Sequence, residues 1–128
     1  MSPALLTKAL LRAAEQLNLS ADLALLLQTA PDEAAQLQSG SRLLDPAKPE
    51  WASALEIVGM FRTLIELLST PERAQAWLGT PNDTLGASPL DLLRSPEAEL
   101  VHRYLSAVRK HELRMPPAWR REHRDEPQ

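Results

Sequence analysis

Apolar residues recur at helical spacing along most of the chain. Over residues 3–17, leucines and alanines lie three or four positions apart, which is the period of an amphipathic helix. The same spacing predicts two short helices over residues 20–28 and 31–38. Residues 51–68 predict the longest helix, with an apolar stripe formed by Trp51, Leu55, Val58, Phe61, Ile65 and Leu68. No stretch alternates with period two, so we expect an all-α fold, a small helical bundle without a sheet.

Prolines mark the expected helix starts. A Ser or Thr caps a helix well and Pro suits its first position, a pairing found at Ser2-Pro3, Thr70-Pro71, Ser88-Pro89 and Ser95-Pro96. We therefore predict short helices that begin at Pro71 and Pro89, and a last helix from Ser95 to Leu113. Prolines within residues 42–50 predict a loop there, because proline cannot sit in a helix interior.

Composition and charge restrict the class of protein. The chain has 128 residues, of which 44% are apolar but only 4% aromatic, so Leu and Ala must fill most of the core. Residues 1–100 carry 7 Lys or Arg against 13 Asp or Glu, whereas residues 101–128 carry 7 against 4. An acidic body therefore precedes a basic tail. The absence of cysteine, of a leader-like N-terminus and of a long apolar run predicts a cytoplasmic protein that does not enter a membrane.

The first three expected helices have the order of a helix-turn-helix unit, which binds DNA through its last helix. Residues 18–40 contain no Lys or Arg, and Asp32 with Glu33 begins the helix that would enter the groove. Because cations supply much of the affinity for phosphate, this surface predicts a structural role and makes DNA binding doubtful. A repressor would need cations from elsewhere, such as Arg12, Arg42 and Lys48.

We find no pattern of catalytic or metal-binding residues in the sequence. The histidines, His102, His111 and His123, are nine and twelve residues apart, so no pair has the four-residue spacing of a helical metal site. No glycine-rich phosphate loop and no serine in a nucleophile-elbow pattern is present. We therefore expect a protein that is not an enzyme and that uses no cofactor or metal.

One segment, residues 76–95 (AWLGTPNDTLGASPLDLLRS), combines glycines and prolines with Trp and Leu. It resembles the toxin-binding domain of Xre/MbcA/ParS-type antitoxins in the order and spacing of its members: Trp77, Leu78, Pro81, Asn82, Leu85, Gly86, Pro89, Leu92 and Leu93. The resemblance extends over residues 4–113. It implies an all-helical protein that is often a homodimer and that neutralises a RES-domain toxin, an enzyme that destroys NAD. Many members also repress their own operon.

The resemblance implies three regions. Residues 1–45 correspond to a degenerate helix-turn-helix, residues 46–113 to a linker helix with the toxin-binding domain, and residues 114–128 to a basic tail that is a candidate for disorder. This sequence departs from the family pattern because its helix-turn-helix is one residue short between Ser20 and Gly40 and has lost the family's usual basic and hydroxyl residues that read DNA. This departure places operator binding in doubt.

Physical chemistry assigns different roles to the members of this segment. We expect Trp77 to pack on the helix over 51–68, Asn82 to close a side-chain turn, and Gly86 to supply a positive φ. Leu78, Leu85, Leu92 and Leu93 are expected in the core, between the Pro81 and Pro89 turns. Polar and charged residues are the predicted toxin contacts: Asn82, Asp83, Thr84, Arg94, Arg103, Arg109, Arg120 and Arg121.

The sequence therefore predicts the antitoxin of a type II toxin–antitoxin system that binds a RES-domain toxin and occludes its active site. The tail from Arg114 would reach over the NAD entrance. Two alternatives stay open: a DNA-binding transcriptional repressor, and an immunity protein against a delivered NAD-degrading toxin.

Overall fold

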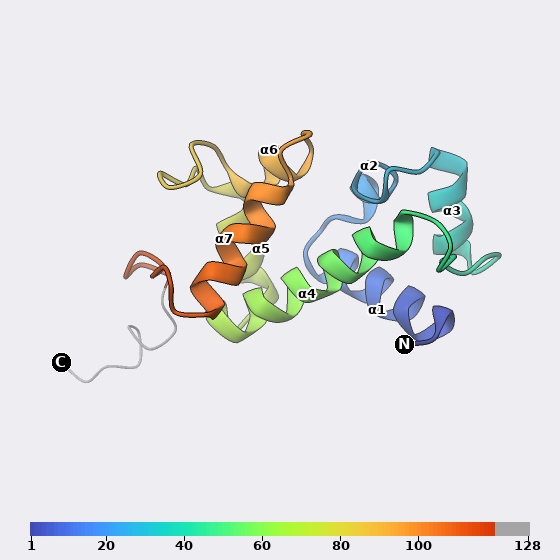
Figure 1. The fold of residues 1–128 in the computed structure, drawn as a ribbon, viewed down its shortest axis with the longest axis horizontal. Coiled ribbons are helices and arrows are strands. Elements are labelled where there is room, and N and C mark those ends of the chain that lie inside the picture. The colour runs from blue at the N-terminus through green and yellow to red at the C-terminus, as the bar shows by residue number, and fades with distance from the viewer. Residues whose placement is uncertain (120–128) are drawn as a thin grey trace. The chain divides into compact units, whose positions relative to one another are not determined.

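The computed structural model describes residues 1–119 (Figure 1). In this part of the chain the expected all-α fold is confirmed, because no strand forms beyond one isolated bridge between Asn82 and Ala87. Among the same residues, none of the helices combines the length and the apolar character needed to cross a membrane. The α-helices are α1 (Pro3–Gln16), α2 (Leu23–Leu27), α3 (Pro31–Ser39), α4 (Glu50–Leu68), α5 (Pro71–Gly79), α6 (Pro89–Leu93) and α7 (Glu99–Arg109), and a 3-10 turn, η1 (Ser20–Asp22), precedes α2.

The chain divides into two compact units. The first comprises Met1–Phe61 and the second begins at Arg62, so the division falls inside α4. Each unit is described by itself below.

Three of the four predicted Ser-Pro and Thr-Pro helix starts are confirmed. The hydroxyl oxygens of Ser2, Thr70 and Ser88 each accept a hydrogen bond from the main-chain N–H three residues later, at 3.1, 3.2 and 3.1 Å. These bonds satisfy amides that the helix itself leaves unpaired at its first turn. A proline follows each cap, where its missing N–H has no cost.

The predicted start of the last helix at Ser95 is wrong. The Ser95 hydroxyl accepts from the N–H of Glu97, two residues later, at 3.0 Å, and donates to the carbonyl of Leu92 at 2.8 Å. This pairing closes a side-chain turn in place of a helix cap. Helix α7 therefore begins only at Glu99.

The predicted end of that helix at Leu113 is also wrong. His111 adopts a positive φ of 65°, and the N–H of Glu112 bonds the carbonyl of Ala107 at 2.8 Å. A second bond runs from the N–H of His111 to the carbonyl of Val108 at 3.1 Å. The pair forms a Schellman closure that ends α7 at Arg109.

The first unit buries leucine and alanine side chains from α1, α2 and α3, as the composition predicts. Fully buried members include Leu6, Leu10, Leu23, Leu27 and Leu37. Thr7 of α1 bonds the loop between α3 and α4, because its hydroxyl oxygen accepts from the N–H of Leu44 at 2.9 Å. The same hydroxyl donates to the carbonyl oxygen of Pro3 at 2.7 Å. The expected helix over 20–28 is present from Leu23, and η1 replaces its first turn.

Helix α4 matches the predicted range, and Val58 and Leu68 of the predicted stripe are buried. Leu55 is 44% exposed, whereas Ala54, Ile57 and Leu64 are buried. An apolar stripe that covers so much of a helix does not define which half faces the core. Small Ala54 lies on the buried side, which the hydrophobic spacing alone did not indicate.

The second unit packs α6 against both α5 and α7. Trp77 of α5 is 2% exposed, and its indole stacks on the ring of Tyr104 of α7, with centroids 5.8 Å apart and planes at 24°. The ring partner of Trp77 is therefore Tyr104 of α7, and the expected packing of Trp77 on the long helix stays a prediction. The leucines of the signature, Leu78, Leu92 and Leu93, are buried as predicted, and Leu85 is half-buried.

Candidate functional site

The loop between α5 and α6, residues 80–88, is held in one conformation by its own side chains. The Asn82 carboxamide oxygen accepts from the N–H groups of Thr84 and Leu85 at 2.9 and 3.1 Å, which confirms the predicted side-chain turn. Gly86 has a φ of 84°, as predicted, and the N–H of Asn82 bonds the carbonyl of Ala87 at 3.1 Å. The loop thus presents Asp83 and Thr84 at a closed tip.

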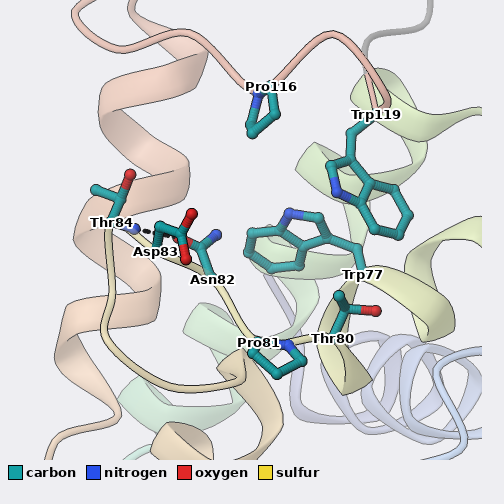
Figure 2. Close-up of a pocket in the computed structure, with 8 residues that line it drawn as sticks. All are labelled: Trp77, Thr80, Pro81, Asn82, Asp83, Thr84, Pro116 and Trp119. Atoms are coloured by element: carbon teal, nitrogen blue, oxygen red, sulfur yellow. Dashed lines mark hydrogen bonds between the residues drawn. The ribbon is translucent and has the colours of Figure 1, made fainter.

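This loop forms one wall of a pocket of about 110 Å³ (Figure 2). Asn82, Asp83 and Thr84, three of the predicted toxin contacts, all line it, together with Thr80 and Pro81. Pro116 and Trp119, from the segment that follows α7, form another wall, and Figure 2 draws Trp77 between the loop residues and Trp119. The pocket is therefore aromatic and proline-rich, with one carboxylate at its rim.

Arg73 of α5 holds the segment after α7 in place. Its Nε donates to the carbonyl of Leu68 at the end of α4, and its Nη2 donates to the carbonyl of Trp119, both at 2.9 Å. Met115 is buried, and the N–H of Trp119 bonds the carbonyl of Pro116 at 3.0 Å. Within residues 114–119, Met115 is therefore buried and Trp119 half-buried, whereas the other four residues are exposed.

Sequence reasoning did not single out Pro116, Trp119 or Arg73. The sequence did contain a signal for this packing, because Trp119 and the two prolines before it lie in an otherwise charged tail. A large apolar side chain normally requires burial.

The predicted arginine contacts do not converge on this pocket. Arg103 lies in a separate surface hollow of about 470 Å³ along α7, with His102 and Lys110. Its side chain is 74% exposed and lies 3.8 Å from Glu99, one turn earlier. Arg109 pairs with Glu66 at 4.0 Å, and Arg94 is exposed at the end of α6. Arg120 and Arg121 lie outside the described residues.

In the first unit, two of the cations considered for DNA binding are paired with carboxylates. Arg42 makes a bidentate contact with Glu50, with Nη1–Oε2 and Nη2–Oε1 distances of 2.9 and 2.8 Å. The Glu50 side chain is fully buried, and it also accepts from the N–H of Asp45 at 2.9 Å. Lys48 lies 3.4 Å from Glu33 in the first turn of α3.

These contacts shift the pKa of Glu50. The hydrogen bonds from Arg42 lower it below the ordinary value, although burial opposes the shift, and the bond from Asp45 adds to the lowering. The same pairing raises the pKa of Arg42. Arg42 is therefore an internal counter-charge of the first unit, which leaves only exposed Arg12 among the three cations outside such a pair.

Among residues 1–119, no group of three or more His, Asp or Glu side chains is arranged to hold a metal ion.

The second unit is a helical domain that carries the signature loop and a pocket lined by two tryptophans. Residues 63–110 match the family model of the antitoxin Xre/MbcA/ParS C-terminal toxin-binding domain. Over these residues the chain is therefore similar to antitoxin toxin-binding domains, a family that implies a toxin as partner and a binding role. No curated protein sequence matches the chain.

Proposed function

We propose that this chain is the antitoxin of a type II system and that it neutralises a RES-domain, NAD-degrading toxin in the cytoplasm by direct binding. The observation that carries the proposal is the toxin-binding domain at residues 63–110, whose signature loop is closed by Asn82 and Gly86. The resemblance of residues 76–95 to antitoxins that act on RES-domain toxins supports the choice of toxin.

Occlusion of the toxin's active site is the proposed mechanism. A toxin site that binds a pyrophosphate carries positive charge, so carboxylates of the antitoxin such as Asp83 can bind at its entrance. Acidic residues of the toxin at the same entrance would bind arginines of the antitoxin. Exposed Arg94 and Arg103 are the proposed charge contacts of the body. Because Met115 is buried and Arg73 bonds the carbonyl of Trp119, the segment proposed to reach over the NAD entrance shortens to residues from Arg120 onward, including Arg121.

The pairing of Arg42 with Glu50 weighs against the repressor alternative, because a cation engaged bidentately inside the protein offers little to a phosphate. An immunity protein would use the same binding chemistry as an antitoxin, so this alternative stays open. We also propose that the chain forms a homodimer, because the family resemblance implies one.

Co-expression with a RES-domain toxin tests the proposal. The full chain should restore growth and keep cellular NAD at the level of a toxin-free control, and it should copurify with the toxin. A matched chain with Asp83→Lys and Arg103→Glu, changes at two exposed positions, should fold and lose part of that protection. Continued NAD loss in the presence of soluble, folded wild-type chain would refute the choice of toxin.

Comparing chains that end at Trp119 and at Leu113 separates the tail from the body. If residues after Trp119 cover the NAD entrance, the chain that ends at Trp119 should still bind the toxin but inhibit it less. Unchanged inhibition by this chain would restrict occlusion to the body. The chain that ends at Leu113 loses the packed segment with Met115, so its effect also includes destabilisation.

A further inference from the structure

The pocket beside the signature loop has a composition that suits one class of side chain. Two indoles, Trp77 and Trp119, and two prolines, Pro81 and Pro116, line it, and Asp83 supplies a carboxylate (Figure 2). Its volume of about 110 Å³ is well above the ~10–15 Å³ that a single water needs. A flat group of several heavy atoms therefore fits, whereas a drug-sized molecule does not.

We propose that this pocket is a receptor for a cationic side chain, arginine in particular, which a partner protein inserts with its charge towards Asp83. Aromatic rings attract cations through their negative faces, and Trp does so best. A planar guanidinium stacks on an indole and donates to a carboxylate at its edge, which a compact ammonium does less well.

Charge complementarity favours a cation over a neutral occupant. Asp83 is the only charged residue among residues 80–88, and it lies at the exposed tip of the loop. Arg73, whose guanidinium donates to the carbonyls of Leu68 and Trp119, is not among the residues that line the pocket. Asp83 is the only charged side chain among the residues that do line it.

The pocket walls are held before any partner arrives. Trp77 stacks on Tyr104, the Asn82 side chain closes the loop that carries Asp83, and Arg73 fixes the main chain at Trp119. Binding of a side chain then requires little ordering of the protein. The entropic cost of binding is therefore small, and most of the free energy of the new contacts contributes to affinity. The identification of the partner with the toxin rests on the proposed function, but the preference of the pocket for a cation does not.

The test uses the full chain and a small probe. The protein has three tryptophans, Trp51, Trp77 and Trp119, so the indole N–H signals in a ¹⁵N NMR spectrum report on the pocket with an internal reference in Trp51. N-acetyl-arginine amide is titrated as the probe, and N-acetyl-citrulline amide serves as its neutral match. We expect saturable shifts at Trp77 and Trp119 with the arginine probe and about tenfold weaker binding of the citrulline probe.

Two variants locate the contact. Asp83→Asn keeps the shape and removes the charge, so the arginine probe should bind about tenfold more weakly. Trp119→Leu removes the indole but keeps the carbonyl that Arg73 contacts, so binding should be lost while the circular dichroism spectrum stays unchanged. Trp51→Phe should leave probe binding as it is.

Three outcomes would overturn the proposal: equal binding of both probes, binding of N-acetyl-proline amide in preference to the arginine probe, and no saturable shift at Trp77 or Trp119. Because no toxin is present in this experiment, its failure is distinct from a failure of the antitoxin proposal, which the NAD measurement decides.

Discussion

The guanidinium of Arg73 donates a hydrogen bond to the main-chain carbonyl oxygen of Trp119, 46 residues later in the chain, at 2.9 Å. The same side chain bonds the last carbonyl of α4 at Leu68. One arginine therefore links the start of α5, the end of α4 and the segment after α7, and it places Trp119 at the wall of the pocket.

Replacing Arg73 by Lys should loosen the segment that carries Trp119. An ammonium keeps the charge but lacks the two separate N–H directions that reach Leu68 and Trp119, so we expect a loss of about 1–2 kcal/mol in the free energy of unfolding. Urea denaturation measures this loss, and Trp119 fluorescence should shift to the red. Arg103→Lys is the matched control, because its exposed ion pair with Glu99 contributes at most about 0.5 kcal/mol. Equal stability of the two variants would contradict the role of Arg73.

The buried Glu50 should make the stability of the chain depend on acid pH. Its pKa lies below the ordinary value because Arg42 donates two hydrogen bonds to its carboxylate. The pair therefore stabilises the folded state fully above the ordinary pKa of a glutamate, and this contribution falls as the pH drops through the lowered pKa.

The Glu50→Gln variant tests this assignment. It should lose about 3 kcal/mol at pH 7, because Arg42 is left without its counter-charge, and the difference from wild type should shrink towards acid pH. Thermal unfolding followed at a series of pH values measures both effects. Glu33 is a more exposed carboxylate. The Glu33→Gln variant should therefore change the free energy of unfolding by less than about 1 kcal/mol and leave its pH dependence unchanged.

The Asn82 side chain should act through the loop rather than as a direct toxin contact. Asn82→Ala removes the acceptor for the N–H groups of Thr84 and Leu85 and should cost about 1 kcal/mol, with weaker toxin binding. Asn82→Asp keeps an acceptor at the same position and should bind toxin nearly as wild type does. Isothermal titration with a RES-domain toxin compares the two. Loss of binding in both variants would instead identify the amide N–H₂ group as a toxin contact.

DNA binding should be weak and without sequence preference. Residues 18–40 carry no cation, and Arg42 and Lys48 contact carboxylates of the same unit. We expect a dissociation constant of about 10⁻⁶ M or weaker at physiological salt, with a steep dependence on salt concentration. Fluorescence anisotropy with the promoter of its own operon and a scrambled duplex measures this. A promoter complex that is much tighter than the scrambled one would contradict this expectation.

Local chemistry in the sequence was sufficient to predict most helices and the signature loop. Helical periodicity located α1, α3 and α4, and the caps at Ser2, Thr70 and Ser88 lie where a following proline predicted them. The turn at Asn82 and the positive φ of Gly86 were likewise predictable. All of these features depend on atoms within about four residues of one another, so the sequence contains the whole interaction.

The tertiary structure decided what depends on residues that are distant in sequence or that compete for one partner. Ser95 resembles the other three caps, but its hydroxyl pairs with Glu97 and Leu92, and α7 starts later. The pairing of Arg42 with Glu50 and of Arg73 with Trp119 follows from which groups the packed helices bring within 3 Å. A charge pattern along the chain does not specify such pairs, because a guanidinium bonds whichever carboxylate or carbonyl lies in reach. The sequence by itself therefore determined the helices and the domain family, and packing determined which arginines are structural and where the pocket lies.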